Sequence, residues 1–154
     1  MQMNKNIRTI LIFLLIGVGV YVFTYLVSGL IAGPSRFSWL LKIDYEQPAE
    51  FIKALIITEI PYVVFGFLWI LKLSDKKEIK NYEEEKTGMI SAFIGIVVTN
   101  FLLYLIYYLD LLIGNTSSTG SLIFFVFPFF AAFFGVVGYA LGHVFYWKRR
   151  QKNK

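Results

Sequence analysis

Four long apolar stretches, residues 7–32, 51–73, 88–113 and 121–147, take up most of this 154-residue chain. Each is at least as long as the roughly 20 residues that an α-helix needs to cross the hydrocarbon core of a bilayer. Backbone N–H and C=O groups find no water inside lipid, so only helices and closed barrels span membranes, and apolar runs without two-residue alternation indicate helices. The sequence therefore predicts an all-α integral membrane protein: one transmembrane domain over residues 1–154, folded as a four-helix bundle with antiparallel up-down topology.

Residue types that carry chemistry in enzymes and metal sites are scarce in this chain. Hydrophobic residues make up 57% of it, cysteine is absent, and the one histidine is His143. This composition excludes thiol redox chemistry, disulfides, cysteine-ligated zinc and multi-histidine metal sites, but it does not exclude a carboxylate-based site. The sequence also lacks the HExxH, GxSxG, Walker and CxxC motifs. We therefore expect no enzymatic activity, no cofactor and no bound metal, and a function exerted within the membrane or at its surfaces.

Basic residues are distributed unevenly between the predicted loops. They gather before the first run, around the loop 74–87 and after the fourth run, whereas the connections 33–50 and 114–120 hold only Arg36 and Lys42. Loops rich in lysine and arginine stay in the cytoplasm. The sequence therefore predicts a multi-pass protein of the cell membrane with both termini and the loop 74–87 inside, and with the other two loops outside.

The chain carries a net charge of +5, and its basic residues are densest in the tail 148–154. Basic residues next to an anionic leaflet each contribute about 1 kcal/mol of attraction. We therefore expect the tail to bind anionic lipid, and we expect no nucleic-acid partner.

The second apolar run contains the most unusual residue, Glu59. It lies about 12 Å below the predicted outer boundary at helical rise, and carboxylates at such depth face a partner or water. Pro61 lacks an N–H, which should loosen the helix beside it. Lys53 lies off the helical face of Glu59, so it should pair with Asp110 of the third helix. That pairing would leave Glu59 as the odd charge and the strongest functional candidate.

Other polar residues lie at a similar level in neighbouring helices. Together they predict a polar vestibule open to the outside, above a closed cytoplasmic half, with the aromatic loop 33–50 as a lid, a short strand or a linker. The candidate vestibule residues are Thr24, Tyr25, Lys53, Glu59, Pro61, Tyr62, Asn100 and Asp110.

Small residues line one face of each of the last two helices. At 100° per residue, each set falls on one side of its helix, and such faces let helix backbones approach closely in membranes. They predict close packing inside the bundle or, through the GxxxG pair, a homodimer; Asn100, off the small face, predicts that its helix contacts two others. The packing residues are Ser91, Gly95 and Thr99 in the third helix, and Ala131, Gly135, Gly138 and Gly142 in the fourth.

Two functions fit these features. The first is a small bacterial cytoplasmic-membrane protein that acts by protein–protein contacts within the bilayer, as an accessory subunit or an immunity-type protector. The second is a small oligomeric transporter or ion-conducting protein that uses Glu59 in the outward-facing vestibule. The expected partners are the lipid bilayer and either another membrane protein or further copies of the same chain.

Overall fold

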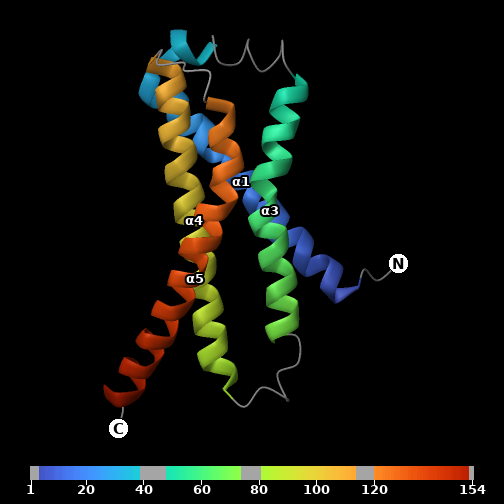
Figure 1. The fold of residues 1–154 in the computed structure, drawn as a ribbon, viewed down its shortest axis with the longest axis vertical. Coiled ribbons are helices and arrows are strands. Elements are labelled where there is room, and N and C mark those ends of the chain that lie inside the picture. The colour runs from blue at the N-terminus through green and yellow to red at the C-terminus, as the bar shows by residue number, and fades with distance from the viewer. Residues whose placement is uncertain (1–3, 39–47, 74–80, 114–119, 153–154) are drawn as a thin grey trace.

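A computed structural model describes residues 4–38, 48–73, 81–113 and 120–152. They form four long helices, α1 (Lys5–Ala32), α3 (Pro48–Leu73), α4 (Tyr82–Ile113) and α5 (Gly120–Lys152), and a short helical segment at 34–38 (Figure 1). Each long helix contains a stretch long and apolar enough to cross a membrane. The predicted all-α class with four apolar spans is confirmed.

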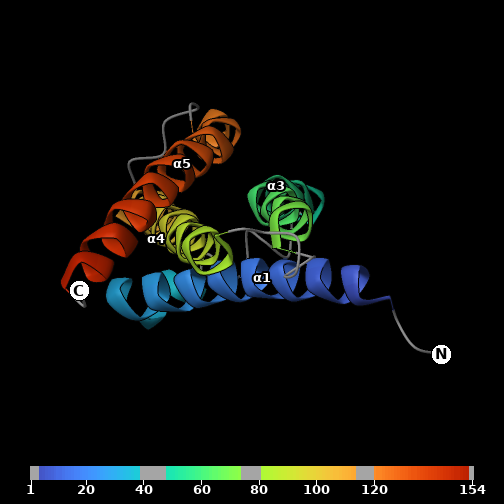
Figure 2. The same cartoon turned by 90° about the horizontal axis from the view of Figure 1, so that it is seen from below.

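Consecutive helices alternate in direction (Figure 1). At the upper end of the molecule in that view α1 and α4 finish and α3 and α5 begin; at the lower end α3 finishes and α4 begins. Figure 2 shows α1 crossing the other helices obliquely. Within the described residues, α4 contacts α1, α3 and α5, whereas α1 makes no contact with α5. Helix α4 thus has three neighbouring helices, whereas the position of Asn100 had predicted two.

The helices extend beyond the apolar runs because their polar ends suit helix termini. Helix α3 begins at Pro48 rather than at residue 51, and proline is favourable in the first helical turn. Helix α4 begins at Tyr82 rather than at residue 88, with three glutamates in its first turn, where the helix dipole favours negative charge. The C-terminal part of α5 carries basic residues, which suit the opposite end of a dipole. The segments 39–47, 74–80 and 114–119, with half of the predicted lid 33–50, lie outside the described residues.

The buried core changes character between the two ends. In the lower half, Phe13 packs edge-on against Phe65 and Phe93, with ring centroids 5.2 and 5.0 Å apart. In the upper half, the core consists largely of tyrosines, with Tyr21 against Tyr104 at 5.6 Å. The lower core is therefore mainly phenylalanine and aliphatic side chains, and the upper core carries more hydroxyl groups.

The small faces of α4 and α5 lie against each other. A Cβ atom at Gly95 would come within 2.5 Å of the backbone oxygen of Phe134, and one at Gly138 within 2.5 Å of the backbone oxygen of Ser91. Both distances are far below van der Waals contact, so only glycine fits at these positions. On the other side of α5, Phe133 is 61% exposed. The GxxxG face is thus covered inside the bundle by α4.

Candidate functional site

Polar side chains from α1, α3 and α4 meet at mid-height and above it, in a region that we call the polar core. Each is less than a tenth exposed, although hydroxyl, amide and carboxyl groups are normally found at the surface. Three helices contribute, so the site exists only in the folded bundle. The polar core consists of Tyr21 and Thr24 of α1, Thr58, Glu59 and Tyr62 of α3, and Asn100, Tyr104 and Tyr108 of α4.

Glu59 is the one acidic side chain of the polar core. It is 8% exposed, and neither carboxyl oxygen has a hydrogen-bond partner among the described residues. Because α3 begins at Pro48, Glu59 lies roughly 16 Å from the nearer helix end, deeper than the apolar run had indicated. A buried carboxylate without a counter-charge is strongly unfavourable. Burial of Glu59 therefore lowers the stability of the folded protein, which is unexpected for a side chain that serves only packing.

The glycine of α1 opposite Glu59 makes room for the carboxyl group. A Cβ atom at Gly17 would overlap Oε2 of Glu59 and lie 2.6 Å from a ring carbon of Tyr62. Helix α1 can approach α3 here only because Gly17 has no side chain. Gly17 lies four residues before Tyr21 and seven before Thr24, so the sequence places it on the polar face of this helix without showing what that face meets.

Two other side chains of the polar core also carry unused polar atoms. The hydroxyl of Tyr62 and both amide atoms of Asn100 are buried, and none of them has a hydrogen-bond partner among the described residues. An unsatisfied buried polar group costs roughly 1–3 kcal/mol. With Glu59, three side chains from two helices thus keep hydrogen-bonding capacity that the packing does not use.

Four hydroxyl groups of the polar core form hydrogen bonds within the protein, those of Tyr21, Thr24, Thr58 and Tyr108. Thr24 donates to the carbonyl of Val20 at 2.7 Å, and Thr58 donates to that of Leu55 at 2.7 Å, so both bond their own helices. The hydroxyl of Tyr108 donates to that of Tyr21 at 2.5 Å and joins α4 to α1. Helix packing accounts for these groups, in contrast to those around Glu59.

The structure does not bring every predicted vestibule residue to the site. Lys53 and Asp110 are exposed, and no ion pair joins them in the part of the chain that the structure describes. Tyr25 is half-buried, with its ring against Phe37 and Tyr108. Pro61 lines a groove on another side of α3, and the helix continues through it.

The expected open vestibule is replaced by a filled core. Thr24, Tyr62 and Asn100 are at most 1% exposed. Two apolar grooves lie among the described residues, and Glu59 lines neither of them. The core is filled rather than open because each tyrosine combines a hydroxyl group with a ring large enough to fill the space between helices.

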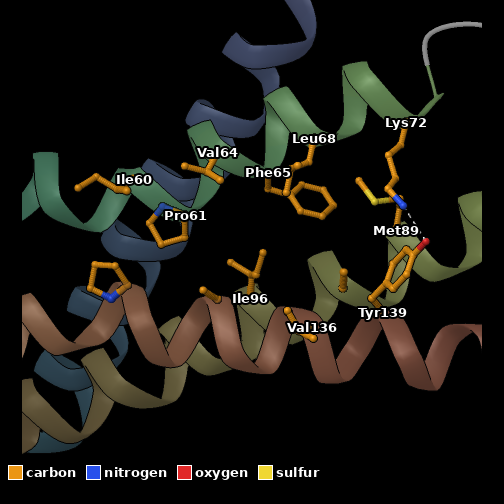
Figure 3. Close-up of a pocket in the computed structure, with 14 residues that line it drawn as sticks. Ile60, Pro61, Val64, Phe65, Leu68, Lys72, Met89, Ile96, Val136 and Tyr139 are labelled. Carbon is orange, nitrogen blue, oxygen red and sulfur yellow. Dashed lines mark hydrogen bonds between the residues drawn. The ribbon is translucent and has the colours of Figure 1, made fainter.

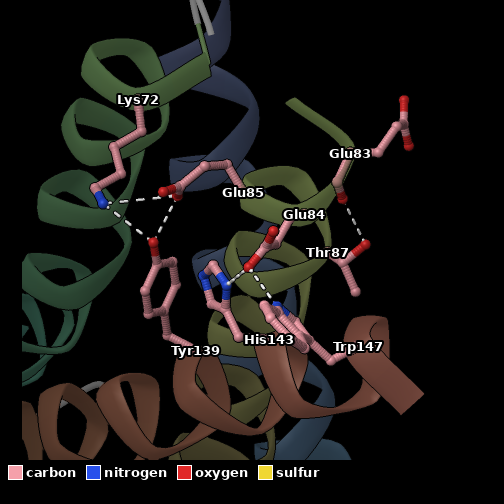
Figure 4. A network of polar contacts seen from close by, with 8 residues as sticks. All are labelled: Lys72, Glu83, Glu84, Glu85, Thr87, Tyr139, His143 and Trp147. Carbon is pink, nitrogen blue, oxygen red and sulfur yellow. Dashed lines mark hydrogen bonds and ion pairs between the residues drawn. The ribbon is translucent and has the colours of Figure 1, made fainter. Parts of the chain in front are cut away.

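A second polar cluster, at the lower end, was missed by sequence reasoning (Figure 4). Lys72 of α3 donates to the hydroxyl of Tyr139 at 3.1 Å, and Tyr139 donates to Glu85 of α4 at 2.5 Å. Glu84 lies 3.0 Å from Nδ1 of His143 and accepts from Trp147 at 3.1 Å. The sequence had indicated a solvated connection with helical extensions here, and the preference of glutamate for a helix N-terminus was the signal for the start of α4.

The contact between Gly17 and Glu59 can be tested by a double-mutant cycle. Gly17→Ala should destabilise the protein by roughly 1–3 kcal/mol, as overpacking does, and Glu59→Ala should remove most of that penalty because it empties the space that the new methyl group needs. Thermal unfolding in detergent measures both. Equal penalties in the two backgrounds would show that the side chains do not share this space.

Comparison with known proteins adds no relative. The chain matches no protein-family model, no curated protein and no solved structure. Function must therefore be argued from the site itself.

Proposed function

We propose that this protein is a small proton-transporting or proton-conducting membrane protein that works as an oligomer, with Glu59 as the group that takes up and releases the proton. The supporting observation is the mid-height carboxyl group, buried and without a hydrogen bond within the described residues. Ionisable groups inside transmembrane segments usually mark ion pathways or proton relays.

Because Glu59 is covered by other side chains, its carboxyl group is better placed to bind a proton than to bind a basic side chain of a partner protein. Gly17 and Tyr62 lie directly over the carboxyl group. A lysine or arginine from another chain would have to separate α1 from α3 to reach it. A proton needs only small rearrangements of hydroxyl and amide groups, and the polar core supplies these in Tyr62 and Asn100.

The difference between the two halves of the core favours a route by which the proton reaches Glu59 from the upper end. Above Glu59, Tyr104 lies beside Thr58, and Tyr21 bonds Tyr108. Below it, the packed rings of Phe13, Phe65 and Phe93 offer no hydrogen-bonding group. Release toward the lower end then requires the helices to rearrange, as expected when access alternates between the two sides of a membrane.

Proton movement into proteoliposomes, followed with an entrapped pH-sensitive dye, tests the proposal. A membrane potential set by potassium and valinomycin should drive acidification that depends on the protein. Flux equal to that of protein-free liposomes, from correctly folded protein, would contradict it.

A second candidate, an accessory subunit or protector that acts through contacts within the membrane, is favoured by Gly19. This glycine lies in an apolar groove of about 520 Å³ between α1 and α4, with nothing within 4 Å of its Cβ position. Glycine inside a helix costs roughly 0.5–1 kcal/mol relative to alanine, and the close approach of another transmembrane helix would explain its presence. Gly19→Leu should then release a stoichiometric membrane partner during purification in mild detergent, whereas Leu15→Ala, outside the groove, should retain it.

The membrane topology is part of the proposal. With both termini in the cytoplasm, the exposed residue Ser35 faces outward and the exposed residue Asn81 faces inward. Because the chain has no cysteine, single-cysteine labelling is unambiguous. A membrane-impermeant maleimide should label Ser35→Cys in intact cells and Asn81→Cys only after lysis. If only Asn81→Cys were labelled in intact cells, the topology would be the inverse of the one proposed.

A further inference from the structure

An apolar groove runs between α3 and α5, with α4 as its floor (Figure 3). Its volume is about 330 Å³. Val64 and Leu68 of α3 form one wall, and Val136 of α5 forms part of the other. Pro61 lies near one end of the groove, and Lys72 and Tyr139 close the opposite end.

The length of the groove corresponds to one leaflet of a bilayer. Pro61 and Lys72 are separated by roughly 16 Å at helical rise, and half of a typical hydrocarbon core is about 15 Å. Lys72 lies in the last turn of α3, at the lower end of the bundle. The groove thus reaches from the interface at that end to the middle of the bundle.

One cation at the groove mouth, Lys72, can bind a phosphodiester. Nζ of Lys72 donates to the Tyr139 hydroxyl at 3.1 Å and lies 3.6 Å from Oε2 of Glu85, and 46% of the Lys72 side chain is exposed. A lysine ammonium has three donors, so Lys72 can still donate to an oxygen outside the protein. The carboxylate of Glu85 already accepts from Tyr139 and offsets part of the Lys72 charge.

We propose that this groove binds a phospholipid from the leaflet at the lower end, with one acyl chain between α3 and α5 and the phosphate on Lys72. The apolar walls suit an acyl chain, the length suits one leaflet, and a cation stands where the headgroup begins. A partner transmembrane helix fits less well, because it would cross both leaflets, whereas the groove covers one. This site is separate from the basic tail and from the polar core.

Native mass spectrometry of the full chain tests the proposal. The protein is purified in mild detergent, exposed to an equal mixture of phosphatidylethanolamine and phosphatidylglycerol, and analysed for retained lipid. We expect one tightly held phospholipid per chain. Lys72→Met should reduce its affinity about fivefold, which corresponds to about 1 kcal/mol.

A groove-filling variant with a matched control makes the test specific. Ala132 is exposed and lines the groove, whereas Ala140, also exposed on α5, does not. Ala132→Phe should abolish lipid retention, and Ala140→Phe should leave it unchanged. Equal retention in the two variants, or no retained lipid in the unmodified protein, would overturn the proposal.

A photocrosslink identifies the occupant without relying on the fold of Ala132→Phe. A benzophenone amino acid in place of Val136, which lines the groove and is 69% exposed, reacts with whatever lies there in the native membrane. The proposal requires an adduct with the mass of a phospholipid. An adduct with a second copy or with another protein would show that a helix occupies the groove.

Discussion

Leucine in place of Gly138 is expected to separate α4 from α5 and destabilise the fold by roughly 3 kcal/mol or more, at or above the upper end of overpacking effects. The new Cβ would lie 2.5 Å from the backbone oxygen of Ser91 and 3.2 Å from the Cα atom of Ala92. No side-chain rotation relieves a clash with backbone. Gly95→Leu should have the same effect from the other helix.

Thermal unfolding and gel filtration in detergent measure this effect. Phe133→Leu is the control, because Phe133 is 61% exposed on the opposite face of α5 and exposed substitutions usually change stability by no more than about 0.5 kcal/mol. If Gly138→Leu and Phe133→Leu melt at the same temperature, the faces of α4 and α5 have been assigned wrongly.

The contact between α4 and α5 could be predicted because it depends on local geometry. Residues four apart lie on one face of a helix, so the spacing of Ser91, Gly95 and Thr99 defines a face before any partner is known. The opposing face of α5 follows in the same way from Gly135, Gly138 and Gly142. The sequence left open whether these faces pack inside the bundle or against a second copy, and the structure pairs them with each other.

The filled polar core could not be predicted, because it depends on how three helices are rotated about their axes. A shift of one residue turns a helix by 100°, which decides whether Tyr104 and Tyr108 fill the interior or line an open space. The expected pair of Lys53 and Asp110 failed for a related reason. Both lie near helix ends, where long side chains reach toward water, so no buried charge requires them to pair.

The cluster at the lower end was missed because charge runs between apolar segments are usually solvated loops. Helix α4 includes Glu84 and Glu85, which brings them to His143 and Tyr139 of α5. Helix N-terminal signals upstream of residue 88 indicate that α4 starts earlier, but they do not indicate which side chains of α5 it meets.

Replacing Glu59 with glutamine is expected to abolish transport while leaving the fold intact. Glutamine keeps the shape of the side chain but carries no charge and no exchangeable acidic proton. Since neither carboxyl oxygen of Glu59 has a hydrogen-bond partner among the described residues, no bond within the described protein is lost. Glu59→Asp retains a carboxyl group at a shorter reach and should keep part of the activity. The melting temperature of Glu59→Gln should equal or exceed that of the unmodified protein.

The role of Glu59 as the proton carrier is tested most directly by proton flux in proteoliposomes that contain Glu59→Gln. Proteoliposomes with Glu83→Gln serve as the control. Both variants make the same chemical change, but the Glu83 side chain is 67% exposed at the start of α4 and lies outside the polar core. We expect Glu59→Gln to fall to the flux of protein-free liposomes, because Glu59 carries the proton, and Glu83→Gln to match the unmodified protein. Full flux through correctly folded Glu59→Gln would contradict this role.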